Sequence, residues 1–561
     1  MSQQTASSQP LPTAADLVPH LSQRLALGWW HVGVCGAFVL LYLVLSHLPI
    51  FFSDVWGHVA YGSWILDHRT LPVYDPIVPL AEGVRLIHSA WLSQVILAFV
   101  ERSGGYEGLC SLYALTILAT SLIYFRTFTV LTGRTGLGFL GAAAALLFWL
   151  SRILVIRPEI FSTFCFAAMM LLVVESDRRQ DEAGRSRSRV FGLLGEALLV
   201  VLFAAWANLH GAFVVGLAFL GCLCAGRAWD VAWKTRSLFA VLADRKFRRA
   251  LWRTELATAA TLLNPHGLDL LISTFRFGSH PNLADIAEWQ KLSAASLEAP
   301  YAAVAFVLLL FVWRHSRRPI AASDVLLLGL FSTAVIFSVR MIGWFGLVYL
   351  YVVMPHIAEL VNRYWPVRAV SPALPQSDEV PREGVNLAGP SFLHSLICLL
   401  LVWCGFALSP LSNPVLGETA RPTASLLNRE TPLGVSKFLR ENPPDGQIWN
   451  PQWWGDWLAW DGPKGLQVFV TTNTVHVLPP QVWRDNLNIS DAAPGWQTNL
   501  QKYRINTLVI HKERQPRLNE AARQLNGWRI VYEDSLGVVL SRNPAAANNE
   551  EVLTSATRDV R

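Results

Sequence analysis

Two turns of this sequence place asparagine, histidine and glycine between apolar segments. The first reads W-A-N-L-H-G at 206–211, and the second reads N-P-H-G at 264–267. Asparagine, proline and glycine are common turn formers, which is the structural alternative, but an imidazole also binds ligands and moves protons. We interpret the polar members as candidate ligand-binding residues: Asn208, His210, Asn264 and His266.

A carboxylate and an imidazole follow the first long apolar run. Asp54 and His58 are four residues apart, so a helix that begins there holds them on one face. A carboxylate beside apolar surface has a raised proton affinity and can act as a general base, and the same pair can instead hold a divalent metal ion. Helix capping by Ser53 or Asp54 is the structural alternative. His88 follows later in the same loop and is a further candidate for binding.

Charged residues also stand at the ends of apolar segments, where they are costly unless they are paired or functional. Arg157 and Glu159 flank Pro158, which suits the first turn of a helix. Arg340 ends another segment, and the planar guanidinium of an arginine matches the oxygens of a phosphate. A local ion pair and a snorkelling arginine are the structural alternatives.

The longest central loop contains a further acidic residue and a tryptophan, Glu288 and Trp289. The tryptophan ring can stack on a sugar, or it can lie in the aromatic belt at a membrane interface. Both residues are therefore candidates for substrate binding.

The composition indicates which class of protein must position these residues. The chain has 561 residues, of which 52% are hydrophobic and 15% charged, whereas soluble proteins carry about a quarter charged residues. The sequence therefore predicts a polytopic membrane protein. Its net charge of +6 comes from basic loops between apolar segments, so it does not indicate a nucleic-acid partner. All seven cysteines lie in apolar segments without a CxxC pair, which argues against a disulfide framework.

Eleven apolar segments are candidate membrane spans. They lie at 29–52, 107–131, 136–154, 158–175, 190–207, 210–228, 251–264, 300–313, 322–340, 342–361 and 391–411. The shorter apolar segment at 91–100 is expected to form an interfacial or re-entrant helix.

Loops rich in lysine and arginine alternate with the loops that hold the candidate residues. If eleven spans are counted from a cytoplasmic N-terminus, every basic loop lies in the cytoplasm, as orientation rules require. The candidate residues then share the outer face of the cytoplasmic membrane, together with everything after residue 411.

These patterns predict several regions. Residues 1–28 form a disordered cytoplasmic N-terminus, and 29–411 form the membrane domain with a first outer loop at 53–106. Within that domain, 366–389 are a cytoplasmic linker rich in proline and serine. Residues 412–424 are a second linker, and 425–543 form a small extracytoplasmic α/β domain with a largely parallel sheet. A disordered tail follows at 544–561.

The chain resembles a group of poorly characterised bacterial membrane proteins in four features. These are the spacing of Asp54 and His58, the W-x-N-x-H-G motif at 206–211, the Glu288–Trp289 pair and Arg340. The layout also resembles the GT-C class of polytopic glycosyltransferases over most of the chain. Asp54 matches the acidic residue that these enzymes carry just after the first span. The resemblance implies an α-helical membrane fold of about 11 spans. Val55 follows Asp54 in place of a second acid, which leaves the need for a metal open.

The resemblance implies transfer of a sugar from a polyprenyl-phosphate donor to a glycan, lipid or protein acceptor. In that reaction Asp54 takes or positions the acceptor proton, and Arg157 and Arg340 hold the phosphate. A divalent metal is an open cofactor. Two other functions stay open: a lipid or sugar transporter or flippase, which would carry charged residues at the midplane of its spans, and a membrane-anchored assembly protein without catalysis.

Overall fold

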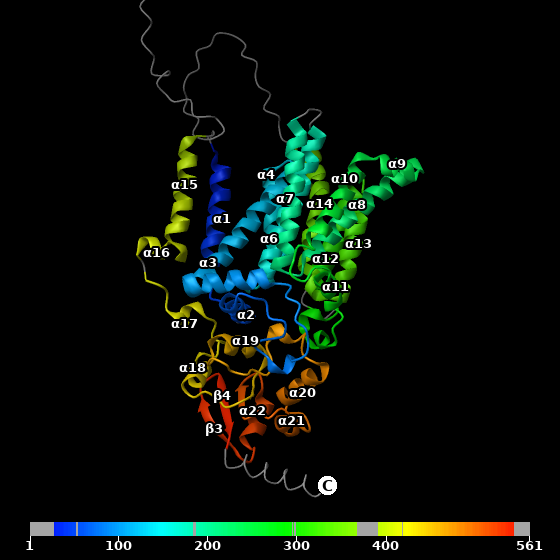
Figure 1. Cartoon of the computed structure of the whole chain (residues 1–561). Helices are drawn as coiled ribbons and strands as arrows, with labels where there is room; N and C mark the ends of the chain where they lie inside the picture. Colours follow the sequence, from blue (N-terminus) through cyan, green and yellow to red (C-terminus); the bar gives the residue numbers. More distant parts are fainter. Residues whose placement is uncertain are drawn as a thin grey trace, which may run out of the picture.

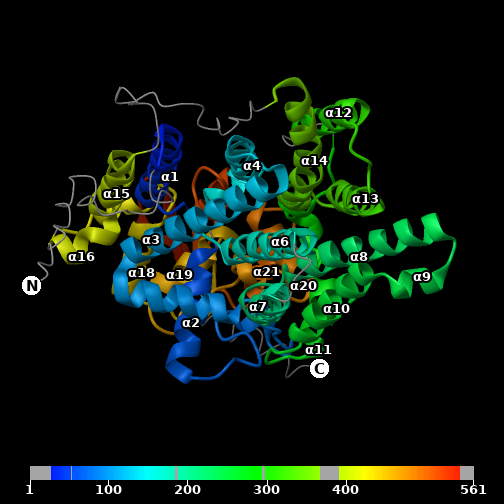
Figure 2. The ribbon, with the colours of Figure 1, turned by 90° about the horizontal axis from the view of Figure 1, so that it is seen from above.

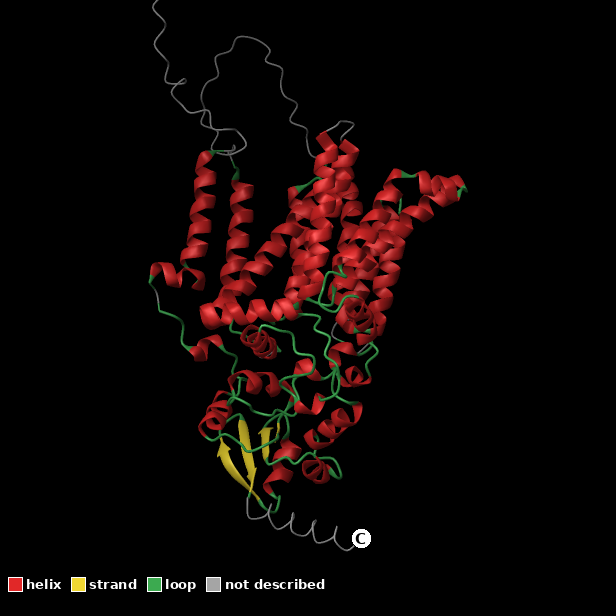
Figure 3. Ribbon diagram, viewed as in Figure 1, coloured by secondary structure: helices red, strands yellow, loops and turns green. Residues whose placement is uncertain are grey.

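The computed structural model describes residues 27–51, 54–182, 187–293, 296, 299–366, 391–417 and 419–543. Of the segments expected to be disordered, 1–26 and 544–561 lie outside the described residues, and so do residues 367–389 of the expected cytoplasmic linker. The described chain is mostly helical, with one small sheet close to its C-terminal end (Figures 1 and 3).

The first part of the chain forms a layer of helices that stand side by side (Figure 1). Its helices are α1 (Trp29–His47), α2 (Val55–His68), α3 (Trp91–Thr132), α4 (Thr135–Phe148), α5 (Leu150–Ile153), α6 (Glu159–Glu182), α7 (Arg187–Leu209), α8 (Phe213–Thr235), α9 (Leu238–Ala243), α10 (Arg245–Ala260), α11 (Leu268–Phe277), α12 (Ala299–His315), α13 (Ala322–Phe337), α14 (Ile342–Tyr364) and α15 (Phe392–Ala407). Short 3-10 helices connect some of them: η2 (Pro79–Ala81), η3 (Pro281–Asp285), η4 (Ala287–Trp289), η5 (Val339–Met341) and η6 (Pro410–Ser412).

A helix lies at each of the eleven segments predicted to be spans. Within the described part of the chain, five helices are long and apolar enough to cross a membrane, and the bent pair Phe392–Ala407 and Pro410–Leu416 gives a sixth candidate. The shorter apolar helices are Thr135–Phe148, Leu194–Leu209, Ala299–His315 and Ala322–Phe337. The chain is therefore a membrane protein by its helices, and the count of eleven crossings stays a prediction.

The helix at the predicted span 251–264 begins and ends earlier than expected. It begins at Arg245 and ends at Ala260, so it takes up basic residues that the sequence pattern assigned to a loop. These residues are Arg245, Lys246, Arg248 and Arg249. The helix is therefore strongly basic in its first half and apolar in its second.

The segment expected to be an interfacial or re-entrant helix forms the first part of α3. The backbone of α3 turns sharply at Gly105, which has a φ of 57° and a ψ of −150°. The first part lies across the lower ends of the other helices, and the second part rises into the layer (Figure 1). It packs closely on α2, because a Cβ at Gly62 would lie 1.9 Å from the carbonyl oxygen of Gln94.

A smaller α/β region lies below the helical layer (Figures 1 and 3). It contains α17 (Thr423–Leu426), α18 (Leu433–Glu441), β1 (Ile448–Trp449), α19 (Gln452–Asp461), η7 (Thr472–Thr474), α20 (Pro480–Ser490), α21 (Trp496–Lys502), β2 (Thr507–His511), α22 (Pro516–Arg523), β3 (Trp528–Glu533) and β4 (Gly537–Arg542). The short helix α16 (Asn413–Leu416) lies instead beside the lower end of α15 (Figure 1). The strand order is β1-β2-β4-β3.

The expectation of a largely parallel sheet was wrong. Only β1 and β2 pair in parallel, whereas β2 with β4 and β3 with β4 are antiparallel. The last two strands form a hairpin, because the carboxylate of Asp534 accepts hydrogen bonds from the backbone N–H groups of Leu536 and Gly537 at 2.8 and 2.7 Å and so closes a tight turn. A hairpin joins antiparallel strands only.

The C-terminal region packs directly against the segment that follows α1. The fully buried ring of Trp56 in α2 packs against two rings of α19, with centroid distances of 5.0 Å to Trp457 and 4.7 Å to Trp460. The side-chain amide of Asn282 also donates to the carbonyl oxygens of Val475 and Leu478, at 2.7 and 3.0 Å. These contacts hold the C-terminal region against the loops at the lower face of the helical layer.

A cavity of about 750 Å³ lies between α1, α3 and α15. Its lining is almost wholly apolar and includes Phe38, Leu118 and Val402. None of the candidate site residues lines it, so the chemistry predicted from the sequence does not belong there.

Candidate functional site

Asp54 occupies the N-cap position of α2, but its side chain makes no capping hydrogen bond. Its Oδ1 atom instead lies 3.0 Å from Nε of Arg157. The carboxylate is only 15% exposed. Capping of α2 by the side chain of Asp54, the structural alternative named from the sequence, is therefore absent from the structure.

Glu288 joins two arginines from distant segments. Its Oε1 lies 2.5 Å from Nη1 of Arg340, and its Oε2 lies 3.3 Å from Nη1 of Arg157. The short helices η4 and η5 hold Glu288 and Arg340 in position, and the backbone N–H of Val339 donates to the carbonyl oxygen of Gln290 at 3.0 Å. Two loops are thus fixed to each other beside Asp54.

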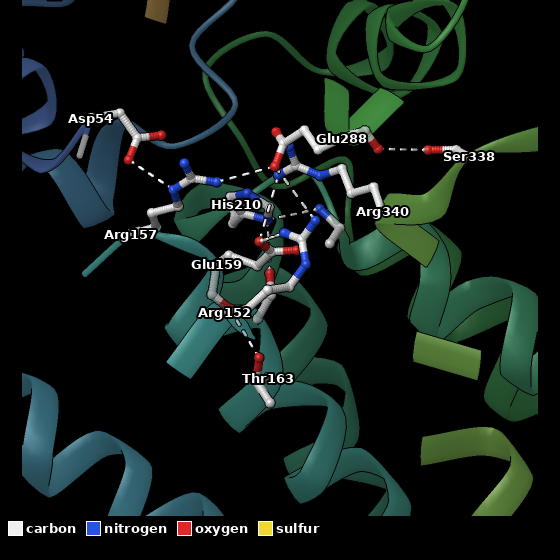
Figure 4. A network of polar contacts seen from close by, with 11 residues as sticks. Asp54, Arg152, Arg157, Glu159, Thr163, His210, Glu288, Ser338 and Arg340 are labelled. Atoms are coloured by element: carbon white, nitrogen blue, oxygen red, sulfur yellow. Dashed lines mark hydrogen bonds and ion pairs between the residues drawn. The ribbon is translucent and has the colours of Figure 1, made fainter. Parts of the chain in front are cut away.

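A third arginine and a third carboxylate complete this ion-pair network. Nη1 of Arg152 lies 2.6 Å from Oε2 of Glu159, and the same oxygen lies 3.6 Å from Nη2 of Arg340. Nη2 of Arg152 also reaches Oε2 of Glu288 at 3.5 Å. We use the term ion-pair network for six residues: Asp54, Arg152, Arg157, Glu159, Glu288 and Arg340 (Figure 4). Three positive and three negative side chains balance, which is what permits their burial.

Electrostatic contacts within the network shift its acid–base properties. The Asp54 carboxylate, followed by Glu288, raises the pKa of Arg157 above its usual value. Burial raises the pKa of Glu288, but Arg340 and Arg157 outweigh it and the pKa is lowered. Both groups are thus held in their charged forms at neutral pH.

His210 adjoins the network without carrying charge. Its Nδ1 lies 2.9 Å from Oγ of Ser162, and this hydroxyl also accepts a hydrogen bond from Nε1 of Trp206 at 2.8 Å. Burial lowers the pKa of His210 to about 4, although Glu159 acts in the opposite direction. A neutral imidazole here can donate or accept a hydrogen bond to a ligand but adds no positive charge.

His58, four residues after Asp54, also has a lowered pKa. Burial lowers its pKa to about 4, with the Asp54 carboxylate opposing that shift. Its Nδ1 lies 3.3 Å from the side-chain amide nitrogen of Gln94 in α3. The predicted adjacency of Asp54 and His58 is therefore present, and the imidazole is neutral.

Trp289 presents its ring to the network. The guanidinium carbon of Arg340 lies 5.1 Å from the centroid of that ring, within range of a cation–π interaction. A sugar that stacks on the Trp289 ring would therefore contact the charged groups of the network.

The other candidates form a second group, the fastening cluster of His88, Asn208, Asn264 and His266. The amide of Asn208 accepts from Nε1 of Trp91 and donates to the carbonyl oxygen of Leu263, both at 2.8 Å. Nε2 of His266 accepts from the backbone N–H of His88 at 3.1 Å. Nε2 of His88 lies 2.8 Å from the carbonyl oxygen of Pro72. The side chains of His88, Asn208 and His266 thus hold neighbouring loops together. The side chain of Asn264 bonds within its own turn, to the carbonyl oxygens of Thr261 and Gly267 and to the backbone N–H of His266. The structure does not bring these four residues into the ion-pair network.

Two residues of the site were not identified from the sequence. Arg152 lies in an apolar run that was predicted to be a span, so its charge was the only available signal. The other is Asp456, at the centre of the run W-W-G-D-W-L-A-W at 453–460. A lone carboxylate inside an aromatic helix is the signal that could have pointed to it.

Asp456 brings the C-terminal region to the site. Its Oδ1 accepts from the side-chain amide of Asn473 at 3.0 Å, and that amide also lies 3.3 Å from the carbonyl oxygen of Asp54. Burial raises the pKa of Asp456 to about 7, and the Asp54 carboxylate adds to the shift. A carboxyl group with such a pKa can exchange a proton at neutral pH.

A metal site was left open by the sequence. Among the described residues no three or more His, Cys, Asp or Glu side chains are grouped in a way that could hold a metal ion. Oδ1 of Asp54 pairs with Nε of Arg157, and Nδ1 of His58 lies within hydrogen-bond distance of the side-chain amide nitrogen of Gln94. The residues present therefore do not fit a metal, and we assign none of the chemistry to one.

Comparison with known proteins concerns the fold alone. No protein-family profile matches this sequence, and no curated protein matches it. Two solved structures from Archaeoglobus fulgidus superpose on most of the chain. The fold is similar to that of an archaeal oligosaccharyltransferase.

One structure is the oligosaccharyltransferase AglB with an inhibitory peptide and a dolichol-phosphate, at 11% identity and a TM-score of 0.51, covering 86% of this chain and 70% of that chain. The other is the oligosaccharyltransferase tethered to an acceptor peptide that contains the NVT sequon, at 11% identity and a TM-score of 0.52, covering 91% and 74%. The GT-C-like fold expected from the sequence is thus supported, while the motifs that suggested it are not tested by this likeness.

Proposed function

We propose that this protein is an integral-membrane glycosyltransferase that moves a sugar from a polyprenyl-phosphate donor to an acceptor at the face of the membrane that carries the ion-pair network. The observation that carries the proposal is that Asp54 leaves its helix uncapped and meets Arg157 beside two further arginines. One structure of similar fold holds an inhibitory peptide and a dolichol-phosphate, and the other holds an acceptor peptide, which supports a lipid-linked donor.

Asp54 acts on the acceptor. Its carboxylate lies between the helical layer and the C-terminal region, and Asn473 fixes its backbone. It takes the proton of the acceptor nucleophile or orients that nucleophile, which is a role for a positioned carboxylate. Asp456 can then hold a proton close to Asp54 without adding a second negative charge at neutral pH and below.

Arg157 and Arg340 bind the phosphate of the donor. Glu288 now bridges these arginines and is 31% exposed, the most exposed of the three acids in the network. A phosphate that arrives from the lipid carries the same charge sign and can take the place of Glu288. The arginines then stabilise the charge that develops on the phosphate as the sugar departs.

The sugar lies between the phosphate site and the loops around it. Trp289 offers a ring face, and His210 offers a neutral hydrogen-bonding group. His58 stands on the Asp54 side. The fastening cluster keeps these loops at fixed distances, so that donor and acceptor meet in one orientation.

The test is transfer from a radiolabelled polyprenyl-phosphate sugar in membranes that contain the full-length protein. Asp54→Asn should reduce release of label from the lipid by at least about 100-fold, the usual contribution of an acid–base group. Asp67→Asn is the matched control, because this aspartate lies in the same helix with its side chain 59% exposed. Full transfer by Asp54→Asn would remove Asp54 from the reaction.

A further inference from the structure

A polar cavity lies at the end of the helical layer opposite to the ion-pair network. Its volume is about 270 Å³, and its lining comes from α6, α8, α10, α13 and α14. On α6, Glu159 of the ion-pair network is separated by 18 residues from Asp177 of this cavity, which is about 27 Å of helix. The cavity is therefore distinct from the site described above.

The lining of this cavity is basic. Arg227 comes from α8, whereas Lys246, Arg249 and Arg253 come from α10. Asp177 is the only acid in the lining. Ser323 and Tyr351 add two hydroxyl groups to the wall.

The arginines of the cavity have carboxylate partners, but these partners do not occupy all of the N–H donors of the arginines. Nε of Arg249 and Nε of Arg253 lie 2.7 and 2.9 Å from the same oxygen of Glu196, and Nη1 of Arg253 lies 2.9 Å from Asp177. Arg227 pairs with Asp244 at 2.7 Å. Each guanidinium is therefore anchored in a fixed orientation.

Two donors remain without a partner. Among the described residues neither Nη1 of Arg249 nor Nη2 of Arg253 has a hydrogen-bond acceptor, although both atoms are buried. The side chain of Arg253 is only 7% exposed. Buried donors are nearly always satisfied in proteins, so two idle N–H groups on adjacent guanidinium groups indicate an acceptor that binds in the cavity. Paired guanidinium forks match the oxygens of a phosphate.

The surroundings of the cavity indicate where the phosphate comes from. Exposed tryptophans stand on the two helices that supply the arginines: Trp229 and Trp233 on α8 and Trp252 on α10. The short helix α9 between them exposes Leu238 and Phe239 at 76% and 85%, and it projects from the layer (Figure 2). Tryptophans and exposed apolar side chains of this kind lie at the level of lipid headgroups.

We infer that this cavity binds the phosphate of an anionic phospholipid headgroup, held by Arg249 and Arg253, at the face of the membrane opposite to the ion-pair network. A volume of about 270 Å³ is that of about nine water molecules and accommodates a phosphodiester with part of its glycerol. Basic pockets between membrane helices are known to take such headgroups. The inference does not depend on the proposed glycosyl transfer.

The experiment uses the purified full-length protein in a neutral detergent. Dioleoyl-phosphatidylglycerol, dioleoyl-phosphatidylcholine and inorganic phosphate are added separately, and bound lipid is counted by native mass spectrometry while the melting temperature is recorded. Phosphatidylglycerol is expected to bind and to raise the melting temperature, and phosphatidylcholine is expected to do neither. Full stabilisation by inorganic phosphate alone would overturn the assignment to a lipid.

Two variants locate the site. Arg249→Gln removes an idle donor and a charge, and it should weaken phosphatidylglycerol binding about tenfold, the usual effect of one charge-assisted hydrogen bond. Ala250→Leu fills the cavity without a change in charge and should also prevent binding. Arg248→Gln is the matched control, because Arg248 is an exposed neighbour on the same helix. Wild-type affinity in both Arg249→Gln and Ala250→Leu, or an equal loss in Arg248→Gln, would overturn the inference.

Discussion

The Oδ1 atom of Asp54 lies 3.0 Å from Nε of Arg157, although Asp54 begins one helix and Arg157 lies just before another. An aspartate at an N-cap normally accepts a hydrogen bond from its own helix. Here the capping interaction is given up for an ion pair that links the segment after α1 to the loop before α6.

Replacement of Glu288 by glutamine should tighten donor binding. If phosphate takes the place of this carboxylate, Glu288→Gln removes the competing charge while it keeps the shape of the side chain. We expect the Kd for polyprenyl phosphate to fall about tenfold, or ~1.4 kcal/mol, a modest effect because Glu288 is partly exposed and screened. The variant should also melt at a lower temperature, because Arg157 and Arg340 lose a partner.

Donor affinity can be measured by the quenching of protein fluorescence on titration with polyprenyl phosphate. Glu82→Gln is the control, because Glu82 is exposed and lies outside the ion-pair network. Unchanged or weaker binding by Glu288→Gln would show that the phosphate does not replace this side chain.

Asp456 should make the stability of the protein depend on pH. Burial raises the pKa of Asp456 to about 7, whereas an aspartate in an unfolded chain titrates near about 3.9. Between these values the folded protein holds a proton that the unfolded chain has lost. Stability therefore falls as the pH rises from about 4 to about 7, and it is constant above.

Asp456→Asn removes this titration. Relative to the variant, the wild-type protein should lose about 2 to 3 kcal/mol of stability between pH 5 and pH 8. The measurement is the melting temperature of both proteins across that range, with Asp445→Asn, an exposed aspartate of the same region, as control. Parallel curves for wild type and Asp456→Asn would contradict the shift.

The contact between α2 and α3 should tolerate no side chain at Gly62. An added Cβ would lie 1.9 Å from the carbonyl oxygen of Gln94, so the helices must separate. Gly62→Ala should destabilise the protein by about 1 to 3 kcal/mol, as overpacking does. At Gly104 an added Cβ meets nothing within 4 Å, and Gly104→Ala should leave the melting temperature unchanged or raise it slightly. Equal melting temperatures for the two variants would argue against this close packing.

The ring of Trp56 should be needed to hold the C-terminal region in place. It is fully buried against Trp457 and Trp460, and loss of such a ring costs about 3 to 5 kcal/mol. Trp56→Ala should therefore speed protease cleavage in the connection at 412–424. Trp29→Ala is the control, because the ring of Trp29 is 58% exposed. Wild-type cleavage rates in Trp56→Ala would show that other contacts suffice.

The sequence by itself determined where the helices of the apolar part lie. Hydropathy is a local property, so each of the eleven apolar segments is a helix in the structure. In the C-terminal region, the alternation of short apolar runs with helix-like stretches also indicated the positions of four helices, α18, α19, α21 and α22, and of the four strands β1 to β4. The run at 466–471 is not a strand, because the side chain of Asn450 takes up the backbone of Phe469 and Val470.

The candidate residues were identified for a local reason as well. A charged residue at the end of an apolar segment is energetically costly unless it is paired or functional. This cost identified Asp54, Arg157, Glu159 and Arg340 as candidates. The same reasoning could not find Arg152 or Asp456, because each lies within a run that looks like ordinary span or core.

Only the tertiary structure decided which of these residues meet. Glu288 balances Arg157 and Arg340 across loops that are more than 50 residues apart in the sequence, and no periodicity encodes such a pairing. The structure also separated His88, Asn208, Asn264 and His266 from the ion-pair network. Backbone groups of other loops bond to His88, Asn208 and His266, whereas Asn264 bonds within its own turn. A charge or a hydrogen-bonding group is a property of one residue, whereas its partner is set by how the whole chain packs.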